Sequence, residues 1–321
     1  MSRRWTALWA AVLPGCSILL DDPPCGVDTG TTVDSGVVES VLWQAVSAGG
    51  LHSCGVDATG AAQCWGLDEE GQATPPAGLS SGVLQVAAGH AHSCAAPDAA
   101  APVCWGRDTD GQVSAAPGDV LVAIDGGGAH SCGRTDGGAV RCWGRDLEGQ
   151  STVPDDIFDG VTPAVDVVAG WRTSCAVDGL GALVCWGDDR DGLVSTAPTA
   201  PVQRVDLGRD FGLAVAETGD LLCWGTAAMC ASVPVVTTGV GVAAGRDWGC
   251  VTDTDGALSC FGTRDVDDPV LADVPVLDSP TELVGASGGL HACALHKSGE
   301  GDGTTATCWG LDDAGQLSVL D

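Results

Sequence analysis

Short apolar segments separated by turn residues fill most of this chain, and they predict strands rather than helices. No long stretch shows apolar residues recurring every three to four positions, the pattern of an amphipathic helix. In the first clear copy of the pattern, short segments around Cys54 and Cys64 flank the turn 57–60. We expect these segments to form a β-hairpin in which Gly60 adopts the left-handed conformation.

This hairpin frame recurs along the chain at intervals of about 40 residues. Its first cysteine stands at 54, 94, 132, 175, 250 and 293, and Leu213 takes that place in a degenerate fifth copy, so the copies number seven. Glycine stands five positions before each of these markers: Gly49, Gly89, Gly127, Gly170, Gly208, Gly245 and Gly288. An aromatic residue and a glycine follow the second cysteine of every copy. Because one such unit cannot bury its own apolar face, a period near 40 predicts a propeller or a solenoid.

The turn glycine is also repeated, although less strictly. Its equivalents are Gly138, Gly181, Gly219 and Gly256, whereas Ala100 departs from the pattern. Segments such as 86–94 (VAAGHAHSC) and 142–150 (CWGRDLEGQ) resemble the regulator-of-chromosome-condensation repeat, and the resemblance covers nearly all of residues 41–321. It implies an all-β, seven-bladed β-propeller that is closed by pairing strands from the two chain ends. The tryptophan–aspartate and double-glycine signatures of other propeller families with similar periods are missing.

Sixteen cysteines are many for a reducing cytosol, and fourteen of them fit intra-blade disulfides. Residues ten positions apart across a hairpin turn lie opposite each other, at Cα distances of about 4.5–5.5 Å that suit a disulfide. In the fifth copy Cys230 appears near Cys223, which suggests a changed partner. The predicted pairs are Cys54–Cys64, Cys94–Cys104, Cys132–Cys142, Cys175–Cys185, Cys223–Cys230, Cys250–Cys260 and Cys293–Cys308. Structural zinc sites need thiolates two to four residues apart in groups of four, and no such cluster is present.

The first residues predict export. Arg3 and Arg4 precede an apolar run from Trp5 to Leu13 that is too short to span a membrane, so residues 1–15 are expected to be a signal peptide. The sequence Leu-Pro-Gly-Cys at 13–16 resembles a bacterial lipobox, which implies lipidation of Cys16. Ordinary cleavage remains the alternative, because proline is unusual in the slot of Pro14.

Residues 16–40 are then a lipidated cysteine and a flexible tether, and residues 41–321 the repeat domain. Ser17 implies outer-membrane sorting by the lipoprotein resemblance. The protein is thus expected in the cell envelope, or otherwise secreted, with a lipid anchor as its only membrane contact. Cys25 has no evident partner.

The net charge of −30 narrows the range of partners. Thirteen basic residues against 43 acidic ones repel a phosphate backbone, so nucleic-acid binding is not expected. Nucleotide exchange on a small GTPase at chromatin, the activity after which the repeat family is known, fits neither this charge nor export. We expect no small GTPase partner.

Two repeated slots carry residues that resemble metal ligands. Four histidines share one slot (His52, His92, His130 and His291), but Thr173, Phe211 and Trp248 occupy it elsewhere, so we interpret it as structural. The aspartates Asp68, Asp108, Asp146, Asp189 and Asp312 stand four residues after the second cysteine. Because aspartate hydrogen-bonds its own backbone in turns, we interpret these as turn residues, with weak calcium binding left open. No metal or cofactor is predicted.

No nucleophile elbow, phosphate loop or metalloprotease helix is present, so no catalytic residue is predicted and the protein is expected not to be an enzyme. Function in repeat proteins usually resides where the copies differ. Segments 227–234, 264–269 and 297–305 differ from the other copies. Aromatic and charged residues at such places often anchor interfaces. The candidate binding residues are Trp171, Arg172, Arg246, Trp248, Arg264 and Asp265.

The sequence favours a surface-tethered binding or scaffold propeller that recognises a protein or glycan partner. Secreted members of the resembling family that block β-lactamases offer an alternative, an exported protein inhibitor. An aromatic content of 4% argues against the aromatic-rich face that such an inhibitor would need. An envelope enzyme that uses the central pocket is a further alternative, and non-repeated carboxylates or histidines on one face would favour it.

Overall fold

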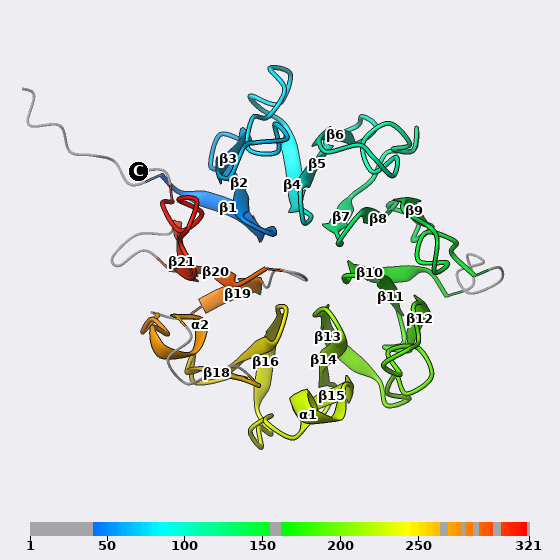
Figure 1. Ribbon diagram of the computed structural model, residues 1–321, viewed down its shortest axis with the longest axis vertical. Coiled ribbons are helices and arrows are strands. Elements are labelled where there is room, and N and C mark those ends of the chain that lie inside the picture. The colour runs from blue at the N-terminus through cyan, green and yellow to red at the C-terminus, as the bar shows by residue number, and fades with distance from the viewer. Residues whose placement is uncertain are drawn as a thin grey trace, which may run out of the picture. The chain divides into compact units, whose positions relative to one another are not determined.

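A computed structural model describes residues 41–154, 162–263, 269–277, 280–284, 289–297 and 303–319. The chain divides into two units, Met1–Glu39 and Ser40–Asp321, and every described residue belongs to the second. In this unit seven three-stranded antiparallel sheets follow one another around a central axis (Figure 1). The predicted all-β, seven-bladed propeller is therefore confirmed.

Each blade consists of three consecutive strands, of which the first lies nearest the axis. The first strands are β1 Trp43–Ala48, β4 Val83–Ala88, β7 Ala123–Gly126, β10 Ala164–Ala169, β13 Val202–Leu207, β16 Gly239–Ala244 and β19 Pro280–Val284. The middle strands are β2 His52–Asp57, β5 His92–Pro97, β8 His130–Arg134, β11 Thr173–Asp178, β14 Phe211–Ala216, β17 Trp248–Asp253 and β20 His291–Lys297. The outer strands are β3 Ala62–Gly66, β6 Val103–Gly106, β9 Val140–Gly144, β12 Leu183–Gly187, β15 Leu221–Gly225, β18 Leu258–Gly262 and β21 Thr304–Gly310. Among the described residues the helices are α1 Ala227–Cys230 and α2 Pro269–Ala272.

Glycine is required at two kinds of position in the frame. Gly60 has φ +80°, as the hairpin turn predicts, and its equivalents in blades 3 to 6 share this conformation. In blade 2 the left-handed residue is Ala99 (φ +56°) rather than Ala100, so this turn accepts a strain that glycine avoids. Gly49 is required for a different reason. A Cβ there would lie 2.6 Å from both the Gly89 carbonyl oxygen and the His52 ring.

All seven predicted disulfides form. Six join directly opposed residues of the middle and outer strands, at Cα distances of 4.0–4.1 Å, somewhat closer than expected. Cys223 on β15 instead bonds Cys230 at the end of α1, with a Cα distance of 5.4 Å. In that blade Leu213, fully buried, packs in the place of the missing cysteine and lies opposite Cys223. The predicted change of disulfide partner in the fifth blade, from residue 213 to Cys230, is therefore confirmed.

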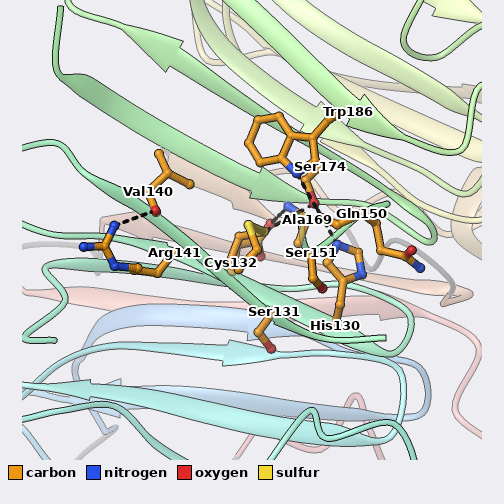
Figure 2. The surroundings of a disulfide bond; sticks show 12 residues. His130, Ser131, Cys132, Val140, Arg141, Gln150, Ser151, Ala169, Ser174 and Trp186 are labelled. Carbon is orange, nitrogen blue, oxygen red and sulfur yellow. Dashed lines mark hydrogen bonds between the residues drawn. A yellow bond between two sulfur atoms is a disulfide. The ribbon is translucent and has the colours of Figure 1, made fainter. Parts of the chain in front are cut away.

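A buried hydrogen-bond relay joins neighbouring blades. Figure 2 shows one copy, in which the Ser174 hydroxyl lies between the His130 ring and the Gln150 carbonyl group. Ser174 donates its single proton to Gln150 (2.9 Å), so Nε2–H of His130 must donate to Ser174 (2.8 Å). The Trp186 indole donates to the same carbonyl oxygen at 3.0 Å. Nδ1 of His130 is therefore unprotonated, and it has no hydrogen-bond partner.

The histidine slot changes together with a slot in the next blade. His52, His92, His130 and His291 bond Ser93, Ser131, Ser174 and Ser53, respectively, at 2.8–2.9 Å. Where the slot holds Thr173, Phe211 or Trp248, the next blade offers Gly212, Gly249 or Ala292 instead. Each histidine is thus matched to one serine, and all four are at most 1% exposed. The structural interpretation of the histidine slot is confirmed.

Replacing Ser174 by alanine is expected to destabilise the propeller by about 1–3 kcal/mol, because Nε2–H of His130 loses its acceptor in a buried site. The measurement is the free energy of unfolding in denaturant. The double variant His130→Phe/Ser174→Gly copies the junction of Phe211 with Gly249 and is the matched control. We expect the double variant to lose less free energy of unfolding than the sum of the losses in His130→Phe and Ser174→Gly measured singly. Additive losses would contradict the pairing.

The ring closes differently from the expectation. No described sheet combines strands from the two chain ends, because β1 to β3 complete blade 1 and β19 to β21 complete blade 7. Instead, the C-terminal loop lies against blade 1, where Ser53 and Trp65 donate to the Gln316 carbonyl oxygen at 3.1 and 2.9 Å. This is the contact that Gln150 makes with blade 4, so the seam repeats an ordinary junction. The expected strand pairing is therefore wrong for the described residues.

The repeated aspartates form part of the turns, as predicted. Oδ1 of each accepts a backbone N–H from five residues further along, at 2.7–3.0 Å, in Asp68, Asp108, Asp146, Asp189 and Asp312. These bonds occupy oxygens that a calcium ion would need. Weak calcium binding stays an untested alternative.

Candidate binding site

Two hollows can be traced on the described part of the domain. The larger, of about 990 Å³, lies on the axis and is lined mainly by the first strands of the blades. The smaller, of about 220 Å³, lies between the loops of blades 2, 3 and 4.

Five carboxyl groups that sequence analysis missed line the axial cavity, and three of them stand on first strands of blades. Asp125 and Asp206 stand on β7 and β13, in a slot that holds serine, alanine or valine in the other blades. Asp166 stands on β10 in a different slot, which holds Arg204 and Glu282 in blades 5 and 7. Burial raises the pKa of Asp206 to about 8 and that of Asp125 to about 6, and the charges of the carboxyl groups repel one another. Burial also raises the pKa of Asp166. The departure of Asp125 and Asp206 from the pattern of their slot was the available sequence signal.

Two of these carboxyl groups, those of Asp125 and Asp206, join neighbouring blades. Asp125 accepts N–H bonds from Gly126 (2.9 Å) and from Ala169 of the next blade (2.7 Å). Asp206 accepts equivalent bonds from Leu207 (2.8 Å) and from Ala244 of the next blade (2.7 Å). Both carboxyl oxygens of Asp125 and both of Asp206 accept hydrogen bonds from backbone N–H groups. These two aspartates therefore have a structural role. Among the described residues no three histidine, cysteine or acidic side chains are placed to hold a metal ion.

The smaller pocket contains two of the predicted binding residues, Trp171 and Arg172, from the loop between β10 and β11. It also contains three residues that sequence analysis missed: His90, Arg107 and Arg145. His90 precedes β5, whereas Arg107 and Arg145 follow β6 and β9. Each stands in a frame position whose residue type varies between copies, but only the fold brings these positions together.

Trp171 is positioned by the blades on both sides of it. A Cβ on Gly128 would lie 3.1 Å from two indole carbons, so the ring rests where blade 3 has no side chain. The ring meets that of His90 edge-on, with centroids 4.8 Å apart. The Arg209 guanidinium lies 5.8 Å from the indole centroid, within cation–π range. The indole is half-buried and held by contacts from three blades.

The arginines differ in how they are held. Arg145 makes a two-pronged ion pair with Glu148 (3.1 Å each), which lowers the pKa of that carboxyl group. Arg172 lies 3.6 Å from Asp188. Arg107 is exposed, bonds Thr109 through Nε at 3.1 Å, and has no carboxylate within ion-pair distance in the described part of the chain. Burial and the charge of Arg107 lower the pKa of His90.

Of the remaining predicted residues, Arg246 and Trp248 do not line this pocket. Arg246 is exposed on blade 6, where its guanidinium lies 3.3 Å from the Asp247 carboxylate. Trp248 is fully buried and donates to the Gly289 carbonyl oxygen at 3.2 Å. Because it fills the histidine slot as a core residue, its prediction as a surface anchor is not supported, and we leave it out of the site. Arg264 and Asp265 lie outside the described residues, as do Cys16, Cys25 and Gly288.

In the same described ranges, no helix is both long and apolar enough to span a membrane. A sequence profile of the Regulator of chromosome condensation (RCC1) repeat matches residues 43–72, 121–150 and 164–193, which lie in blades 1, 3 and 4. No curated protein sequence matches the chain.

Several solved structures share the fold. The ectodomain of the Physcomitrella patens receptor kinase CR4 is 24% identical with a TM-score of 0.65, over 83% of this chain and 72% of that one. The CRINKLY WD40 ectodomain of the Arabidopsis thaliana receptor kinase ACR4 is 21% identical with a TM-score of 0.64, over 83% and 96%. Human WBSCR16 is 16% identical with a TM-score of 0.67, over 80% and 87%. At these identities the likeness concerns the fold alone. The chain is therefore a seven-bladed β-propeller, braced by seven intra-blade disulfides, in which the RCC1 repeat is matched in blades 1, 3 and 4.

Proposed function

We propose that this protein is an exported, surface-tethered binding module that recognises a protein or glycan partner and catalyses no reaction. The observation that carries the proposal is the pocket around Trp171 and Arg172. Its arginine, histidine and tryptophan side chains come from three blades and stand at positions whose residue type varies between the copies, so they are not needed to build a blade. Aromatic and arginine side chains in fixed positions are the usual anchors of binding sites.

The rigidity of the scaffold supports this function. Each blade has one disulfide. Neighbouring blades are linked by histidine–serine hydrogen bonds or by hydrogen bonds from backbone N–H groups to aspartate carboxyl groups. A preorganised surface loses little conformational entropy on binding, which favours affinity.

The proposed location follows from the cysteines and the N-terminal sequence. Seven disulfides are typical of proteins that fold in an oxidising compartment. The predicted signal peptide, Cys16 acylation and tether up to residue 40 would hold the domain at the surface of the cell envelope.

Affinity capture from the envelope of the source cell tests the proposal. The bait is the mature exported chain, crosslinked and analysed by mass spectrometry for protein and by saccharide analysis for glycan. Trp171→Ala is expected to lose the partner. Arg141→Ala, which removes an exposed arginine outside the pocket, is expected to retain it. If wild-type protein retains nothing over repeated captures, or if both variants retain the partner equally, the proposed binding site is wrong.

A further inference from the structure

The smaller pocket has more guanidinium groups than carboxylates in its lining. The chain has a net charge of −30, yet this pocket is lined by three guanidinium groups, from Arg107, Arg145 and Arg172, and by a single carboxylate, from Asp110. A fourth guanidinium, that of Arg209, lies over Trp171. Arg145, Arg172 and Arg209 each lie within 4 Å of a carboxylate. Arg107 has no carboxylate within ion-pair distance among the described residues, so its charge is available to an anionic ligand.

Two of the arginines retain hydrogen-bond donors for such a ligand. Arg172 lies 3.6 Å from Asp188, and its side chain makes no hydrogen bond within the described ranges. Arg107 uses only Nε, toward Thr109. Arg145 is held by Glu148, so it contributes charge at a fixed position. A guanidinium group has five N–H donors in a planar fork that matches a carboxylate, so Arg107 and Arg172 are equipped to bind one.

The pocket also has an apolar wall and a limited size. The Trp171 indole and Ala91 and Ala129 line it together with the charged groups. Its volume of about 220 Å³ lies below the range of roughly 300–1,000 Å³ for sites that enclose drug-sized ligands. It therefore suits a group of the size of one sugar residue, with the ring against the indole and a carboxylate on the arginines.

The charge outside the pocket restricts the ligand further. At an ionic strength of 0.15 M charges are screened beyond about 8 Å, so the arginines attract an anionic group only once it enters the pocket. Acidic residues around the pocket repel further negative charges of the ligand that lie close to the bound group. Asp108, Asp188 and Asp189 stand on the same loops. A chain whose carboxylates are separated by neutral residues meets both conditions.

We propose that this pocket binds a uronic-acid residue of an acidic glycan, with its carboxylate on Arg107 and Arg172 and its ring against Trp171. This inference rests on the proposed binding function and specifies its ligand. An acidic peptide is the competing occupant, and the test separates the two.

The test is isothermal titration calorimetry of the mature exported protein with a hyaluronan tetrasaccharide, in which glucuronate alternates with a neutral sugar. Chitotetraose, of similar length but without carboxylates, is the matched neutral probe, and a glutamate-containing tetrapeptide is the peptide probe. We expect binding of the hyaluronan fragment alone, weakening as salt is raised. Arg107→Gln and Trp171→Ala are each expected to weaken binding about tenfold or more. Arg141→Gln, at an exposed arginine on β9 that does not line the pocket, is expected to leave it unchanged.

Arg107→Gln keeps the test independent of folding, because Arg107 has no ion pair within the described residues that its loss would break. The melting temperature of each variant verifies this. Equal binding of the two sugars, or no binding of either, would overturn the proposal, as would binding of the peptide alone. A partner captured from the envelope in a Trp171-dependent manner would then leave the binding function standing, whereas failure of both experiments would reject the function itself.

Discussion

Reduction of the seven disulfides is expected to unfold the propeller at room temperature. Six of them close loops that span ten or fifteen residues, and one closes a loop of seven. On the chain-entropy account each such loop contributes about 2–3 kcal/mol. The net free energy of unfolding of a domain is only about 5–15 kcal/mol, so loss of all seven disulfides is expected to remove an amount of the same order as this net stability. Circular dichroism in increasing concentrations of a thiol reductant, with alkylation to count free cysteines, measures the effect.

A single-pair variant separates the disulfide effect from general damage by the reductant. Cys175→Ala/Cys185→Ala removes a fully conventional bond between β11 and β12 and is expected to cost about 2–3 kcal/mol. Retention of the native spectrum in a sample whose fourteen cysteines are all alkylated would show that the hydrophobic and hydrogen-bonded junctions suffice without covalent support.

The frame of the fold was accessible from sequence because every blade repeats it. The hairpin turn at Gly60 and the opposed cysteines follow from local spacing, and both were predicted correctly. Even the degenerate fifth copy was predictable, since the loss of a cysteine at Leu213 coincides with the gain of Cys230. Local rules succeed here because each hairpin is formed by residues close in the chain.

The junctions between blades were less accessible, because they join residues about 40 positions apart. The pairing of His130 with Ser174 is visible in sequence only after the register between blades is known. Ring closure through Gln316 was not predicted, because the family resemblance implied that strands from the two chain ends would pair. The burial of Trp248 could have been inferred from its place in the histidine slot.

The pocket itself required the three-dimensional arrangement. Trp171 and Arg172 departed from the frame visibly, whereas His90, Arg107 and Arg145 are separated from them by up to two blades along the chain. The indole reaches His90 only because Gly128 has no side chain between them. This gap over blade 3 results from side-chain packing between blades. The spacing of the repeats in the sequence does not predict it.

Acid is expected to destabilise the propeller through its four buried histidines. Burial lowers the pKa of His52 and His130 to about 3 and that of His92 and His291 to about 4, from an ordinary value of 6.5. Each histidine therefore binds a proton more readily in the unfolded chain. The stability that neutral histidine contributes is fully present above pH 6.5 and is lost as the pH falls toward 3 to 4, at about 1.4 kcal/mol per pH unit for each residue.

The axial carboxyl groups act in the opposite direction. Their pKa values in the folded protein, about 6 for Asp125 and about 8 for Asp206, lie above the ordinary value of 3.8. The folded form therefore binds their protons more readily, and these groups stabilise the propeller as the pH falls from 8 toward 4. Four histidines oppose this gain, so we expect a net loss of stability between pH 6.5 and pH 4. Asp206→Asn removes part of the gain and is expected to make the loss steeper.

The double variant His130→Phe/Ser174→Gly isolates the contribution of one histidine. It removes one titrating group while copying a junction that the protein already contains between Phe211 and Gly249. The slope of the free energy of unfolding against pH is expected to fall by about 1.4 kcal/mol per pH unit between pH 6 and pH 4.5. Denaturant titrations of both proteins at several pH values measure this slope. An unchanged slope would mean that the buried imidazole of His130 does not couple the stability of the propeller to pH.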